Sequence, residues 1–159
     1  MSTPDRLASV TLDSATLPAA TAEIEHERRV AIFDLIEDNS FCLPPRDGVP
    51  DGPLQLLLCV RAGRLVFDLS AESGEKVAEF HLSFGPFRQV VKDYFQICES
   101  YFDAVKRLPP AQIEAIDMAR RGIHNEGART LQERLEGKAS LDIDTARRLF
   151  TLICALIPE

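Results

Sequence analysis

The residues best suited to chemistry lie in a short polar run between two glycines, Gly122-Ile123-His124-Asn125-Glu126-Gly127. An imidazole and a carboxylate two positions apart could serve as a general base and the group that orients it. The flanking glycines would let a ligand approach the backbone, and the two preceding arginines could hold an anion. The candidate catalytic residues are therefore His124 and Glu126, and the candidate ligand-binding residues are Arg120, Arg121 and Asn125.

The same run has a second interpretation that needs no ligand. Gly122 would end one helix, Asn125 would cap the next, and Glu126 would lie in the first turn of that helix, where a carboxylate is favoured. Under this interpretation the polar residues only terminate and start helices. The sequence alone leaves both interpretations open.

Known catalytic and metal-binding motifs are absent. His26-Glu27 begins like the metalloprotease motif H-E-x-x-H, but position 30 is valine. His124-x-Glu126 begins like the zinc-deaminase motif, but no P-C-x-x-C follows. We predict no metal site and no cofactor, although three histidines brought together by the fold remain an alternative. The chain also lacks a P-loop and a G-x-S-x-G elbow.

Two arginine pairs, Arg120-Arg121 and Arg147-Arg148, suggest a further hypothesis of weak phosphate or RNA binding by the C-terminal half. Acidic residues alternate with these pairs, and no aromatic residue lies among them to stack on a base. The whole chain is acidic, with a net charge of −7. All of that excess falls in residues 1–106, whereas residues 107–159 are neutral. Nucleic acid is therefore not an expected partner, and the neutral half suits a homodimer or another protein partner.

The elements that would position these residues follow from hydrophobic periodicity. Alternation predicts a strand at 7–12 and an antiparallel three-stranded meander over 54–60, 65–69 and 77–82. Helical spacing predicts helices at 20–38, from 86 to about 107, from 110 to a break at Gly122, from 125 to 135, and near the C-terminus. A further edge strand is predicted at 140–143. The fold class is α+β, with a small antiparallel sheet against helices and a helical C-terminal half.

A single domain covers residues 1–159, because this length suits one hydrophobic core. Residues 1–5 are predicted to be a frayed N-terminus. Residues 39–53 contain four prolines and two glycines, which disfavour a helix or central strand. We predict a loop there, within the domain and not between two domains.

Several strings of the sequence, taken in order, resemble a bacterial uncharacterised protein family, number 0262 in the UPF series. The strings are HERRVAIFDL at 26–35, PFRQVVKDYFQICESY at 86–101, QIEAIDM at 112–118, RRGIHNEG at 120–127, LQERL at 131–135 and DTARRLFTLIC at 144–154. The resemblance covers most of the chain apart from the proline-rich loop and the two ends. It implies no activity, cofactor or catalytic residue.

No signal peptide is evident at the start of the chain, and the longest nearly apolar run is too short to span a bilayer. We therefore expect a cytoplasmic protein without a membrane partner. The absence of catalytic motifs favours a non-catalytic interaction or regulatory domain. The alternative is a small enzyme or ligand sensor that uses His124 and Glu126, with the nearby arginines as an anion site.

Overall fold

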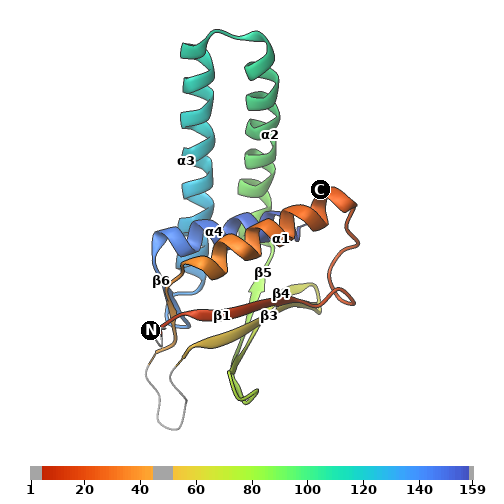
Figure 1. Ribbon diagram of the computed structural model, residues 1–159, viewed down its shortest axis with the longest axis vertical. Helices are drawn as coiled ribbons and strands as arrows, with labels where there is room; N and C mark the ends of the chain where they lie inside the picture. The colour runs from red at the N-terminus through yellow and green to blue at the C-terminus, as the bar shows by residue number, and fades with distance from the viewer. Residues whose placement is uncertain (1–4, 45–51, 158–159) are drawn as a thin grey trace.

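A small sheet carries two helices on one face, and a long helical hairpin projects away from it (Figure 1). The computed structural model describes residues 5–44 and 52–157. The chain therefore has the predicted α+β class, with a helical C-terminal half. None of the described helices is long and apolar enough to cross a membrane.

The main sheet has four strands in the order β1-β3-β4-β5. The predicted meander is confirmed, because β3 (Leu54–Arg61), β4 (Arg64–Ala71) and β5 (Lys76–Ser83) pair antiparallel. Strand β1 (Leu7–Leu12) joins the other side of β3 in parallel, so the sheet is mixed and not purely antiparallel. A parallel pair needs a crossover connection, and helix α1 lies in the segment between β1 and β3.

A two-residue turn sets the register of the meander. Arg61 pairs with Arg64 across Ala62 and Gly63, whose φ angles are 52° and 72°. Positive φ at both central residues is the type I′ geometry that matches the twist of a hairpin. The register places Leu58 opposite Phe67, and both side chains are fully buried.

Helices α1 (Ala22–Glu37) and α4 (Ile143–Cys154) lie side by side over one face of the sheet (Figure 1). Thr21 caps α1 by accepting a hydrogen bond from the amide of Ile24, and Asp142 caps α4 in the same way. Buried Arg28 of α1 donates to the carbonyl groups of Pro18 and Ala155, which ties α1 to the end of α4.

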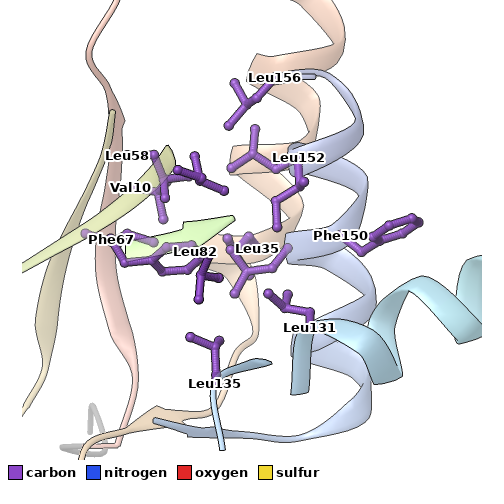
Figure 2. Close-up of a cluster of buried hydrophobic side chains, with 14 of the residues drawn as sticks. Val10, Leu35, Leu58, Phe67, Leu82, Leu131, Leu135, Phe150, Leu152 and Leu156 are labelled. Carbon is purple, nitrogen blue, oxygen red and sulfur yellow. The ribbon is translucent and has the colours of Figure 1, made fainter. Parts of the chain in front are cut away.

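The core lies between this helical pair and the sheet (Figure 2). Helix α4 is part of this core. Burying each leucine or phenylalanine contributes about 1.5–3 kcal/mol. Figure 2 labels side chains from the sheet, from α1, from α4 and the turn after it, and from the end of α3: Val10, Leu58, Phe67, Leu82, Leu35, Leu131, Leu135, Leu152 and Leu156. Phe150, also labelled, points from α4 away from the sheet and toward α3.

Part of the predicted loop at 39–53 is ordered. Phe41–Cys42 forms strand β2, which pairs with β6 (Ser140–Leu141) in a separate two-stranded sheet. The predicted strand near 140 therefore exists, but it is not at the edge of the main sheet. Residues 45–51 of the predicted loop, and residues 1–4 of the predicted frayed terminus, lie outside the described residues.

Helices α2 (Gly85–Arg107) and α3 (Pro110–Arg134) form the projecting hairpin (Figure 1). The prediction that Gly122 breaks α3 is wrong, because the helix is continuous over 25 residues. Gly122 lies on the exposed side of α3, where a side chain would meet no other atom within 4 Å of its Cβ. One exposed glycine costs about 1 kcal/mol in a helix, which the rest of α3 and its packing can offset.

Candidate functional site

His124 lies on α3 where this helix meets α2 and α4. Its ring centroid is 5.2 Å from that of Tyr94 on α2 and 5.4 Å from that of Phe150 on α4. Both neighbouring rings are tilted or edge-on, an arrangement that aromatic pairs favour. The imidazole is therefore half-buried between two rings, and three helices fix its position.

Gly127 brings α4 close enough to α3 to build this corner. A Cβ atom at position 127 would lie only 2.2 Å from Cζ of Phe150. The missing side chain thus leaves the space that the Phe150 ring fills. Phe150 in turn places its neighbour Thr151 beside His124, since Nε2 of His124 lies 2.8 Å from Oγ1 of Thr151.

The Thr151 hydroxyl lies within hydrogen-bond distance of two groups, Nε2 of His124 and the carbonyl oxygen of Arg147. This hydroxyl donates its only hydrogen to the carbonyl oxygen of Arg147, at 3.1 Å. Its oxygen can then only accept from Nε2–H of the imidazole. In this arrangement of hydrogen bonds the neutral imidazole carries its proton on Nε2, and Nδ1 is an acceptor.

The surroundings of His124 keep it uncharged at neutral pH. Burial lowers the pKa of His124 to about 4, assisted by the positive charges of Arg147 and Arg120. Burial also raises the pKa of Tyr94 to about 12, so its phenol stays protonated. The corner therefore presents neutral hydrogen-bonding groups within a positive field.

Two adjoining hollows open beside this histidine, and we call them together the arginine hollow. One, of about 260 Å³, is lined by Tyr94, Arg120, Arg121, His124 and Arg147. The other, of about 270 Å³, is lined by His124, Asp144, Arg147, Arg148 and Thr151. The fold therefore brings together His124, Arg120 and Arg121, three of the five residues singled out from the sequence.

The charges around the arginine hollow do not balance. Asp117 pairs with both Arg120, at 2.5 Å, and Arg121, at 3.3 Å. Arg147 lies 3.8 Å from Asp144, a longer contact. The guanidinium of Arg120 also stacks 4.7 Å from the ring centroid of Tyr101. Four arginines thus face two carboxylates, and the local excess is positive in a chain whose net charge is −7.

Glu126 and Asn125 do not line the arginine hollow. Residues two apart on a continuous helix point to different sides, and the Glu126 side chain is exposed. Thr151 occupies the place next to the imidazole that was predicted for Glu126. The Asn125 side-chain oxygen is buried, with no hydrogen-bond partner among the described residues.

Sequence reasoning missed Tyr94 and Thr151 as parts of this corner. Tyr94 has the spacing of an ordinary core aromatic on α2, and Thr151 lies 27 positions from His124. Neither belongs to a local motif. Tyr94 and Thr151 lie beside His124 through the packing of three helices, including that of α4 against α3 at Gly127, and no local pattern in the sequence predicts that packing.

The cysteines and histidines elsewhere offer no competing centre in the part of the chain that the structure describes. Burial raises the pKa of the Cys98 and Cys154 thiols, which keeps them in the unreactive protonated form. His81 pairs with Glu79 on the exposed sheet surface, at 2.6 Å. Within residues 5–44 and 52–157 no three side chains of metal-binding type lie close enough to hold an ion.

Comparison with known proteins identifies relatives over nearly the whole chain. The family model described as "Uncharacterised protein family (UPF0262)" matches residues 4–158. A UPF0262 protein of Paracoccus denitrificans is 75% identical over 156 residues, covering 97% of this chain and 96% of the relative. A UPF0262 protein of Roseobacter denitrificans is 72% identical over 153 residues, which cover 95% of this chain and 96% of the relative. A third relative, from Cereibacter sphaeroides, is 71% identical over 154 residues, which cover 96% of this chain and 98% of the relative. No solved structure is significantly similar to the chain.

Proposed function

The chain belongs to the uncharacterised bacterial family UPF0262, whose name carries no activity, and we propose that it is a non-catalytic cytoplasmic interaction protein. Its contact surface is the outer half of the α2–α3 hairpin, residues 99–121, which we call the arm. The catalytic alternative is less favoured, because among the described residues the imidazole of His124 is hydrogen-bonded to the hydroxyl of Thr151 and not to a carboxylate.

The apolar surface of the arm is the observation that carries this proposal. Of all the residues between 99 and 121, only Ala104 is buried, at 2% exposure. Phe102 is 66% exposed, and Val105, Leu108 and Met118 are also exposed. Large apolar side chains that gather on a projecting element mark an interaction site more often than a free surface.

A second copy of the same chain is the partner that the charges of the arm favour. A chain of net charge −7 repels its copy. The arm is the exception, because its acidic and basic residues balance: Glu99, Asp103, Glu114 and Asp117 against Lys106, Arg107, Arg120 and Arg121. Two arms could therefore approach without the repulsion that separates the bodies, and pack as a four-helix bundle.

The chain offers a matched pair of phenylalanines to test this. Phe102 on the arm and Phe33 on α1 are 66% and 64% exposed. We expect Phe102→Ser to weaken dimerisation about 30-fold or more, as the loss of an interface anchor worth about 2 kcal/mol would. Phe33→Ser should leave it unchanged. Light scattering after gel filtration, over 1–100 μM protein as a rough range, measures both.

Two results would contradict self-association through the arm. One is a wild-type protein that stays monomeric over the whole concentration range. The other is an equal loss of dimer in both serine variants, because such a loss would place the interface elsewhere or reflect general destabilisation.

A ligand-sensing role is the second candidate, and the arginine hollow favours it. Its positive excess, the two adjoining cavities and the neutral imidazole suit an oxoanion such as phosphate. A bound anion would offset the field of Arg147 and raise the pKa of His124. We expect pyrophosphate to raise that pKa, followed by NMR, in the wild type and in Arg129→Gln but not in Arg147→Gln. An unchanged titration of His124 in excess pyrophosphate would exclude this role.

A further inference from the structure

A large apolar groove lies at the base of α2, apart from the arginine hollow, and reaches the first residue of the arm at its far end. Its volume is about 770 Å³, which falls in the range of about 300–1,000 Å³ typical of small-molecule sites. The loop after β1, the end of β3, the start of α2 and the last described residue all contribute. The apolar residues that line it are Leu17, Val60, Phe84, Val91, Phe95 and Ile157.

This apolar lining is accessible to a ligand. Leu17 and Val91 are buried, while Val60, Phe84, Phe95 and Ile157 are only partly buried although they pack against the core. Half-covered apolar side chains along a concave surface gain free energy when a ligand displaces water from them. The groove therefore suits a molecule with an extended apolar part.

Two cations stand at one end of the groove. Arg88 and Lys92 are four residues apart, and so lie on the same side of α2, and both line the groove. Within the described residues neither takes part in an ion pair or a side-chain hydrogen bond. Arg88 lies at the end of the first turn of α2, which begins at Gly85, where the helix dipole adds positive potential.

The charge at the other end has the opposite sign. Glu99 also lines the groove, about 16 Å further along α2 than Arg88 at 1.5 Å per residue. An acidic group would be attracted to the end with Arg88 and Lys92 and repelled from Glu99. The two ends of the groove therefore carry opposite charges, with the cations Arg88 and Lys92 at one end, Glu99 at the other and apolar side chains between them.

We propose that this groove binds a single-chain organic acid, a free long-chain carboxylate. The carboxylate lies between Arg88 and Lys92, and the alkyl chain runs over Val91 and Phe95 along the apolar lining. Both parts are needed, because the cations are exposed and an exposed ion pair alone contributes little to affinity.

Calorimetric titration of the full chain with octanoate, decanoate and dodecanoate, below their micelle concentrations, tests the apolar part. We expect saturable binding of one molecule per chain, tightening up to about fourfold for each added CH₂ group. 1-Octanol, which has the chain but not the charge, should bind about tenfold more weakly than octanoate. No saturable binding of dodecanoate, or equal affinity for octanol and octanoate, would overturn the proposal.

A double variant tests the acidic part. Arg88→Gln with Lys92→Gln should weaken decanoate binding about tenfold or more. The control, Arg129→Gln with Lys138→Gln, removes the same charge from two exposed positions that do not line the groove, and should bind as the wild type does. All four positions are exposed, so unchanged thermal melting of both variants is expected and is checked first. Equal weakening in both would mean that only net charge matters, which would overturn the site.

Vesicles distinguish a free acid from a membrane surface. Sedimentation with vesicles of phosphatidylcholine and phosphatidylglycerol should leave the protein in the supernatant. If the vesicles retain the wild type but not the Arg88→Gln, Lys92→Gln variant, and free decanoate does not bind, the cations serve a lipid surface and the proposal is overturned.

Discussion

Gly122 and Gly127 lie on the same helix, and replacing each of them with alanine should change stability in opposite directions. A Cβ atom at position 122 meets nothing within 4 Å. Alanine there gains only the better helix propensity, worth about 0.5–1 kcal/mol. A Cβ atom at position 127 would lie 2.2, 2.4 and 2.5 Å from the Cζ and the two Cε atoms of Phe150.

The cost at Gly127 follows from those distances. Carbon atoms in contact prefer about 3.5–4.0 Å, so the Phe150 ring would have to move by about 1 Å or more. The ring is fully buried and packs against Tyr94 and His124, so such a movement would disturb both of these contacts. Overpacking costs about 1–3 kcal/mol, and three contacts this short place the cost in the upper part of that range, about 2–3 kcal/mol. The propensity gain offsets about 1 kcal/mol of it. We expect Gly127→Ala to lose about 1–2 kcal/mol, which places it about 2–3 kcal/mol below Gly122→Ala.

Urea unfolding followed by circular dichroism measures this difference in the free energy of unfolding. The midpoints can be compared only if the dependence of that free energy on urea concentration is the same in all the proteins. In thermal melts the two variants should differ by about 4–12 °C, at roughly 2–4 °C per kcal/mol for a chain of this size. Adding Phe150→Leu to Gly127→Ala should recover part of the loss, and the double-mutant cycle would show a coupling of about 1 kcal/mol.

Two outcomes would refute this reasoning. A Gly127→Ala protein as stable as the wild type would mean that Phe150 does not fill the space beside this glycine. A destabilised Gly122→Ala protein would mean that Gly122 has a special conformation, as a helix break at that position would require.

The remaining predictions concern pH and one buried hydroxyl. The pKa of His124 is about 4 in the folded state and about 6.5 in the unfolded chain, so between these values the unfolded state binds more protons. Stability should therefore fall as the pH drops from 6.5 to 4, and His124→Gln should flatten that part of the profile; an NMR titration of His124 near 6.5 would contradict this. Thr145 is fully buried, and its hydroxyl accepts a hydrogen bond from the amide of Ser40 at 2.8 Å. Thr145→Val should cost about 1–3 kcal/mol, because it leaves that amide unpaired, whereas Thr130→Val, at a less buried position whose hydroxyl donates only within its own helix, should cost less than about 1 kcal/mol.

The elements that the sequence predicted well are those whose signal is local. The alternation in β3, β4 and β5 and the helical spacing in α1 and α2 depend on residues a few positions apart. The pairing of β2 with β6 joins segments about a hundred residues apart, and β2 lies in the proline-rich stretch. No local pattern in the sequence predicts this pairing. The predicted break at Gly122 gave too much weight to one residue, since packing along α3 outweighs a cost of about 1 kcal/mol.

The same distinction holds at the site. Linear proximity grouped His124 with Glu126, but a continuous helix turns about 100° per residue and separates them. Spatial proximity instead joins His124 to Tyr94, Thr151 and Arg147, which come from two other helices. Arg120 and Arg121 could be predicted because they lie one turn before the histidine on the same helix.

The apolar stripe of α2 shows why exposed and buried roles could not be separated from the sequence. Near the sheet its residues Phe87, Val90 and Val91 are in the core. One continuous spacing leads on to Phe102 and Val105, which are exposed because α2 extends beyond the body of the protein (Figure 1). Periodicity reports which side of a helix is apolar, not where the helix leaves its core. The length of α2 relative to the sheet therefore decides that the inner half of the stripe stabilises the fold, while the outer half lies exposed.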